Sequence, residues 1–194
     1  MKTGIIASLT IGAILVIGGI STIGGYSSLA SKKLAVSDAL SRTGTVVTVS
    51  KDTIKGLDKV LNGERKGNVD AYKALAAGRN DLAAATTAFE KETDPALKTS
   101  LLAQIWKTQS GLKVTFENNP SLTTADQSKF LMTQMTENGN KLQFALNKVT
   151  TATTAYNQAR ILNPAVVFGF PQMPQYNSSF VPNDDSLSIN GSAQ

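Results

Sequence analysis

Very few side chains in this sequence have the types and spacing that chemistry at neutral pH requires. Glu90 and Asp94 lie four residues apart, so on one helix their carboxylates would share a face and could bind a metal ion. Helix surfaces often carry such pairs without any ligand. The chain has no histidine and no cysteine, which removes the commonest general base and the thiolate nucleophile. We therefore expect no catalytic residue, no cofactor, no metal and no enzymatic activity.

The charge pattern argues against a nucleic-acid partner. The 194 residues include 19 basic and 14 acidic side chains, a net charge of +5. A nucleic-acid-binding surface usually shows clustered basic residues with aromatic side chains between them, and this sequence shows no such cluster. We expect no nucleic acid among the partners.

One polar run, MTENGNKL at 135–142, stands inside the most regular helical pattern of the chain. Asn138 falls on the apolar seam, where a buried asparagine sets helix register and must be hydrogen-bonded. The expected partners are backbone groups of the turn at 118–120 or a polar seam residue such as Thr43, Ser50 or Arg79. Gly139 would let another backbone approach closely. The functional alternative is a ligand or partner site built on Glu137 and Asn138.

Four helical segments must position these residues. Apolar residues repeat at alternating steps of three and four, which places them on one helix face. The repeats predict helices over 36–61, 72–89, 95–116 and 124–163, with Asp94 capping the third and Pro95 beginning it.

The seam of the last helix is Leu131, Met135, Asn138, Leu142, Ala145, Val149, Ala152, Tyr156 and Ala159. The third stripe is Leu97, Leu101, Ile105, Leu112 and Phe116. Long helices joined by short turns predict an all-α, elongated antiparallel bundle of three to four helices with coiled-coil packing.

The N-terminal region predicts a transmembrane helix. Residues 3–31 form an uncharged run of 29 residues, and a spanning helix needs about 20 apolar residues. We expect residues 4–25 to contact the lipid bilayer, and the helix to continue into the first bundle helix because no proline precedes Pro95. The alternative is a signal peptide cleaved after Ser28-Leu29-Ala30. One basic residue precedes the run and three follow closely, which predicts a single-pass protein with its bundle in the cytoplasm.

Three regions follow from this pattern. Residues 1–31 form the transmembrane anchor, 32–164 the helical bundle, and 165–194 a tail rich in proline, asparagine and serine. We expect the tail to be largely disordered after about residue 180. Four aromatic side chains of the tail are candidates for docking onto the bundle: Phe168, Phe170, Tyr176 and Phe180.

Several motifs, taken in order, resemble the LemA family of membrane-anchored helical proteins. They are LKVTFENNPSL at 112–122, Phe130, MTENGNKL, TTAYNQARILNP at 153–164 and VVFGFPQMPQY at 166–176. The basic, proline-containing run that is usual in the family's first soluble helix is absent from 42–57. The residues that carry the resemblance are Pro120, Leu122, Phe130, Thr136, Glu137, Asn138, Tyr156, Asn157, Pro164, Phe168, Gly169 and Phe170. The resemblance implies an elongated antiparallel bundle on one membrane anchor, and it implies no reaction.

Two functions are consistent with these features. The first is a non-enzymatic scaffold or interaction module, anchored in the membrane by one helix and bound to a protein partner. The second is a subunit of a membrane-derived oligomeric or filamentous assembly, with the N-terminal helices forming its core. Oligomers that persist in detergent through residues 1–30 would favour the second function, and monomers the first.

Overall fold

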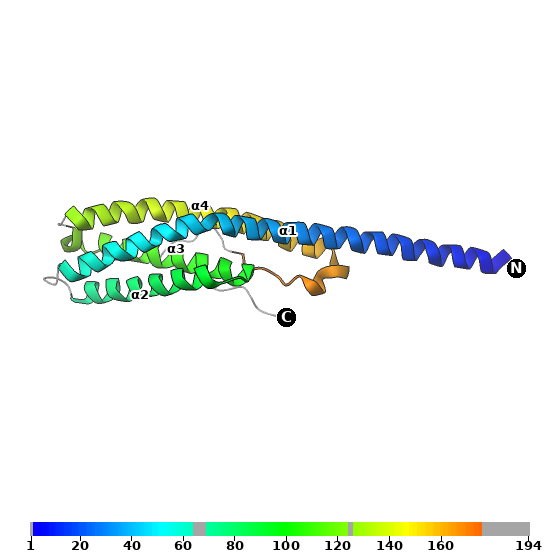
Figure 1. Cartoon of the computed structure of the whole chain (residues 1–194), viewed down its shortest axis with the longest axis horizontal. Helices are drawn as coiled ribbons and strands as arrows, with labels where there is room; N and C mark the ends of the chain where they lie inside the picture. The colour runs from blue at the N-terminus through cyan, green and yellow to red at the C-terminus, as the bar shows by residue number, and fades with distance from the viewer. Residues whose placement is uncertain (1, 64–68, 124–125, 176–194) are drawn as a thin grey trace.

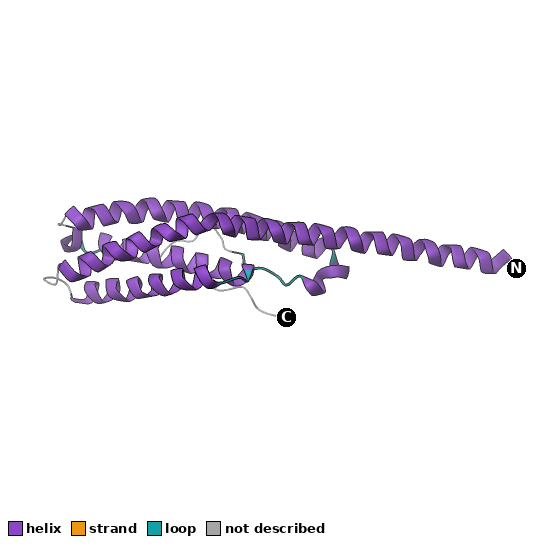
Figure 2. Cartoon of the chain, viewed as in Figure 1, coloured by secondary structure: helices purple, strands orange, loops and turns teal. Residues whose placement is uncertain are grey.

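The computed structural model describes residues 2–63, 69–123 and 126–175, and for residues 2–23 it describes the backbone alone. Most of the described residues are helical and none of them lies in a strand, which confirms the all-α prediction (Figure 2). Their elements are α1 (Lys2–Gly63), α2 (Val69–Lys91), α3 (Pro95–Glu117), the 3₁₀ helix η1 (Pro120–Thr123), α4 (Asp126–Leu162) and the 3₁₀ helix η2 (Pro164–Gly169).

The four long helices form an elongated bundle in which consecutive helices reverse direction (Figure 1). Two ion pairs record the antiparallel arrangement of α1 and α2, because Lys51 pairs with Glu90 while the later Asp58 pairs with the earlier Arg79. Arg79 donates from Nε and Nη2 to the two carboxylate oxygens of Asp58, at 2.8 and 3.0 Å. The predicted antiparallel bundle is therefore confirmed.

The buried face of α4 follows the predicted seam. Eight of its nine positions are buried, and Ala152 is half-buried. On α1 the seam turns slightly near its C-terminal end, where Thr53 and Val60 are buried while Ile54 and Leu61 are half-buried. Both sets lie three or four residues from their predecessors, so the spacing alone allowed either.

One end of the predicted α3 stripe is wrong, because Leu97 is exposed. Leu97, Leu101 and Ile105 are separated by steps of four, and each such step turns about 40° past a full helical turn. Leu97 therefore lies about 80° away from Ile105 around the helix. The core face is formed instead by Thr99 and Leu102. The predicted cap is confirmed, since Asp94 accepts hydrogen bonds from the backbone of Ala96 and Leu97.

α1 continues without interruption from the N-terminal run into the bundle, as the absence of proline predicted. Packing against the bundle begins before the expected boundary at residue 32, because Leu29 is fully buried and Gly25 lies against Asn163. A Cβ added to Gly25 would lie 2.7 Å from Asn163 Oδ1, so the absence of a side chain at Gly25 allows this close contact. Residues 2–23 extend past the bundle as a single helix (Figure 1).

Among the residues whose side chains are described, no helix is apolar over a length that would cross a membrane. The predicted transmembrane anchor falls mainly on residues 1–23, whose side chains lie outside that part of the chain. The predicted disorder after residue 180 also concerns residues outside the described ranges.

Candidate functional site

Glu90 and Asp94, the carboxylate pair considered in the sequence, do not share a helix face and serve two different structural roles. α2 ends at Lys91, so Asp94 no longer belongs to the helix that carries Glu90. Glu90 pairs with Lys51 of α1 at 2.7 Å, and Asp94 caps α3. In the described ranges, no three acidic side chains gather closely enough to hold a metal ion.

Asn138 belongs to a group of buried polar side chains, Ser50, Thr53, Gln109 and Asn138, which we call the polar layer. Its side chain is 4% exposed, and Nδ2 donates a hydrogen bond to Oγ1 of Thr53 at 3.3 Å. The prediction of a buried, paired asparagine is confirmed. The partner is a polar residue of the seam, as expected, but none of the three residues that were named, because the rotation of α1 brings Thr53 to the seam.

Gln109 links three helices in the same layer. Ser50 Oγ of α1 donates to Gln109 Oε1 at 3.3 Å, and Gln109 Nε2 donates to the backbone carbonyl of Met135 on α4 at 3.2 Å. The sequence reasoning missed Gln109, although a signal was present. Ile105 and Leu112 lie seven residues apart on the α3 seam, and position 109 completes the four-three step between them.

The polar layer consists of neutral hydroxyl and amide groups, which exchange hydrogen bonds but carry no charge at neutral pH. Such groups suit the selection of one helix register, because a shifted register would leave them buried without partners. The layer therefore favours one register of α1, α3 and α4 relative to one another.

The other polar side chains of the run are exposed or half-buried, and its glycine does not serve the predicted purpose. Glu137 is exposed, and a Cβ added to Gly139 would meet nothing within 4 Å. Close helix contacts occur instead at Gly56 and Gly78. A Cβ added at Gly56 would lie 2.6 Å from Leu131 Cδ1, and one at Gly78 would lie 2.7 Å from Leu112 Cδ2.

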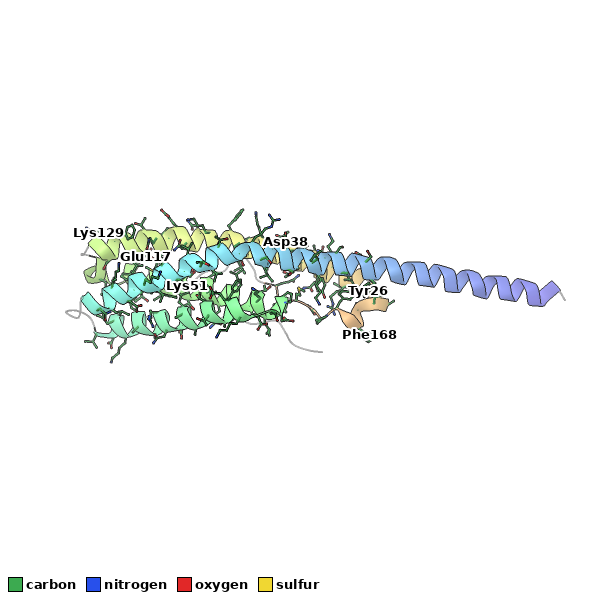
Figure 3. All side chains as sticks on the ribbon, in the orientation of Figure 1. Tyr26, Asp38, Lys51, Glu117, Lys129 and Phe168 are labelled. Carbon is green, nitrogen blue, oxygen red and sulfur yellow. The ribbon has the colours of Figure 1, made fainter. Side chains whose placement is uncertain are left out.

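The outer face of α4 presents two phenylalanines to solvent. Phe130 and Phe144 are 65% and 63% exposed, and their separation of fourteen residues places them on nearly the same face of the helix. Lys148 lies over the ring of Phe144, with Nζ 4.5 Å from the ring centroid. A shallow hollow beside this face is lined by Lys129, Met132, Thr133 and Thr136. Figure 3 shows Lys129 and Glu117 near one end of the bundle and Phe168 towards the other.

A second cluster, the tail latch, holds residues 170–175 against the end of α4. The Tyr156 hydroxyl donates to the carbonyl of Pro171 at 2.8 Å, and Arg160 Nε donates to the carbonyl of Phe170. Asn157 pairs with the backbone of Met173 twice, donating from Nδ2 at 2.7 Å and accepting from its N–H at 3.1 Å. Burial raises the pKa of Tyr156, and the positive charge of Arg160 opposes the shift.

The structure separates the remaining residues of the LemA-like motifs. Pro120 begins η1, and Leu122 is buried there, where the chain turns from α3 towards α4. Pro164 begins η2 at the opposite end of α4. Of the four tail aromatics, Phe170 docks in the latch, whereas Phe168 is 98% exposed. Tyr176 and Phe180 lie outside the described residues.

Exposed apolar side chains gather where α1 leaves the bundle. We call this group the apolar end and define it as Tyr26, Ile161, Leu162 and Phe168, all well exposed. Figure 3 places Tyr26 and Phe168 together at this end, beside the point from which α1 continues alone. The ring of Tyr26 meets the ring of buried Phe170 edge to face, with centroids 5.3 Å apart.

The fold and its two polar clusters define an elongated antiparallel four-helix bundle with a latched C-terminal segment. Comparisons with protein-family models, with curated proteins and with solved structures found no match.

Proposed function

We propose that this protein is a non-enzymatic helical scaffold or interaction module of LemA type, anchored in a membrane by a single N-terminal helix. The observation that carries the proposal is the continuity of α1, a 62-residue helix whose N-terminal part extends past the bundle. The same helix that packs α2, α3 and α4 together thereby carries the uncharged run at 3–31.

The composition of that run supports a membrane environment. Its 29 uncharged residues include the segment 4–25, which is long enough for the roughly 20 residues that a spanning helix requires. A helix also satisfies its own backbone hydrogen bonds, which a segment within lipid must do. An apolar helix that leaves its bundle needs another apolar environment, and a bilayer supplies one over a matching length.

The surface of the bundle supports a role in protein contacts. Exposed aromatic side chains are frequent anchors of protein interfaces, and α4 presents Phe130 and Phe144 to solvent. The interior, in contrast, uses its polar side chains to hold helices together. The LemA-like motifs agree with this division, because Asn138, Tyr156 and Asn157 serve packing while Phe130 and Glu137 face outward.

Membrane fractionation of cells that produce the full chain tests the anchor. The parent protein should sediment with membranes and resist extraction by alkaline carbonate. The double variant Ile11→Arg, Ile14→Arg should lose membrane association, because each arginine at the centre of a spanning helix costs about 2.5–3.5 kcal/mol. The control Leu34→Arg adds charge at an exposed bundle position and should fractionate like the parent. A parent protein found in the soluble fraction would overturn the proposal.

Crosslinking in intact cells tests the interaction role and separates it from the alternative. A monomer in detergent that crosslinks to a different protein supports the interaction module. Oligomers that persist in detergent and disappear in the Ile11→Arg, Ile14→Arg variant support instead an assembly whose core is formed by the N-terminal helices.

A further inference from the structure

We propose that the apolar end of the bundle is a second membrane contact, which inserts Phe168 and its neighbours into the interfacial layer of the same bilayer that holds α1. This inference rests on the proposed function, because the bilayer must lie at the N-terminal end of the bundle. The occupant is a phospholipid surface, and the contacting elements are η2 and the last turn of α4.

The exposure of this group is the first argument. Phe168 is 98% exposed, and Ile161 and Leu162 are 78% exposed each. A soluble surface tolerates single apolar side chains, but a group of three large ones at one tip is characteristic of a binding surface. The tail latch, which follows η2, holds Phe170, Pro171 and Met173 through hydrogen bonds that involve none of these three side chains.

The position of the group is the second argument, and it selects the lipid surface as the occupant. Gly25 of α1 lies against Asn163, so η2 begins at the level where the uncharged run leaves the bundle. Tyr26, one residue further along α1, contacts Phe170 at the same level. With residues 4–25 in the bilayer, η2 is therefore brought to the height of the lipid headgroups, where aromatic side chains concentrate in membrane proteins.

The charges around this end are the third argument. Between residues 151 and 175 the only charged side chain is Arg160, and between 24 and 37 the only ones are Lys32 and Lys33. The charged side chains of these two stretches are therefore all basic, and the first acidic residue after Tyr26 along α1 is Asp38. Basic groups next to apolar side chains suit contact with a surface that contains anionic phospholipids.

Tryptophan fluorescence of the full chain, reconstituted in vesicles of phosphatidylcholine and phosphatidylglycerol, tests the contact. Trp106 is the only tryptophan of the chain, so Trp106→Phe gives a silent background. Phe168→Trp then places a probe on η2 without disturbing the core, because the Phe168 side chain is almost fully exposed. The matched control is Phe130→Trp, which is also exposed but lies at the opposite end of α4. A third variant, Ile14→Trp, reports the uncharged run.

Lipids brominated near the headgroup should quench the probe at position 168 and shift its emission to shorter wavelength, while the probe at position 130 keeps its emission. Equal, unquenched emission at positions 168 and 130 would overturn the membrane contact. A blue shift at position 168 without quenching would also overturn it, because protein would then cover the site.

The probe at position 14 keeps this inference separate from the proposed anchor. Quenching at 14 without quenching at 168 would leave the anchor in place and refute the second contact. Because position 14 lies near the middle of the uncharged run, it is read with lipids brominated at the ends of their acyl chains. Absence of quenching at 14 by these lipids would refute the anchor, and with it the proposal that η2 contacts the bilayer that holds α1.

Discussion

The side-chain amide of Asn138 donates a hydrogen bond to the hydroxyl of Thr53, joining the middle of α4 to α1 across 85 residues of sequence. Both side chains are buried, at 4% and 0% exposure. Because Gln109 joins Ser50 to Met135 one turn away, three of the four long helices share this layer. If this layer sets the helix register, substitutions of Asn138 should change the stability of the bundle in a specific order.

Asn138→Asp should destabilise the bundle strongly at neutral pH, because it would bury an ionised carboxylate without a basic partner. Asn138→Ala should cost about 1–3 kcal/mol, since the variant leaves a small cavity and removes a partner from Thr53. Asn138→Leu should be neutral or stabilising, because an apolar side chain of similar size packs on the seam without a partner. Thermal unfolding of the full chain in detergent, followed by circular dichroism, measures these changes.

The matched control for this series is Asn140, which lies two residues further along α4 and is exposed. Asn140→Asp should change the free energy of unfolding by less than about 0.5 kcal/mol. Equal melting temperatures for Asn138→Asp and Asn140→Asp would show that the polar layer contributes nothing to stability.

The glycines should divide into two classes according to their surroundings. Gly56→Ala and Gly78→Ala should destabilise by about 1–3 kcal/mol, because the new Cβ would overlap Leu131 or Leu112, both buried in the core. Gly139→Ala should stabilise by up to about 1 kcal/mol, because nothing lies near its Cβ and alanine has the higher helix propensity. Denaturant unfolding of the three variants distinguishes the classes, and a destabilised Gly139→Ala would contradict the open surface there.

Removal of the central side chain of the tail latch should release residues 170–175. Asn157→Ala removes both hydrogen bonds to the Met173 backbone, so the amide of Met173 should exchange with solvent much faster. Asn147→Ala, on the exposed face of the same helix, should leave that exchange unchanged. Hydrogen exchange read by mass spectrometry measures the difference, and equal protection in both variants would mean that the tail is held elsewhere.

Alkaline pH should weaken the latch through Tyr156. Its pKa is raised in the folded protein above the ordinary value of 10.0, so folding favours the neutral phenol. The stability from this group is present below pH 10 and is lost as the pH rises through the folded-state pKa. Below pH 10 the parent should be more stable than Tyr156→Phe by about 1 kcal/mol, the contribution of one hydrogen bond.

The advantage of the parent over Tyr156→Phe should shrink above pH 10, where ionisation removes the proton donated to Pro171. Comparison of the two melting temperatures at each pH cancels the titration of the lysines, which both proteins share. An advantage that persists unchanged to pH 11 would show that Tyr156 is not the titrating group.

The fold was predictable from the sequence because a four-three repeat over many turns has only one helix face to bury. α4 shows this best, since the seam from Leu131 to Ala159 lies in the core. The repeat was less accurate at helix ends. Leu97 was assigned to the correct helix, but its side chain lies on the exposed face. At Thr53 and Ile54 the pattern allowed two rotations of α1, and the choice depends on contacts with α4.

The candidate site was less predictable because it depends on pairs of distant residues. The burial of Asn138 follows from its position in the repeat, but its partner depends on the rotation of α1. The motifs around Tyr156 and Phe170 were recognised separately, and their contact requires the reversal of the chain at Asn163 and Pro164. The apolar end was not predicted at all, because it joins Tyr26 to residues more than 130 positions later.

Because α1 is unbroken, the bundle and the N-terminal part of the helix must tilt together. With residues 4–25 in a bilayer, as proposed, no hinge separates the inserted segment from the bundle, so any tilt of one is a tilt of the other. α4 has 37 residues, and its length at 1.5 Å per residue is about 55 Å. A change of about 10° in helix tilt, of the size that bilayer thickness can impose, would therefore sweep the distal tip sideways by about 10 Å. Local membrane thickness would thereby set the reach of Phe130 over the surface.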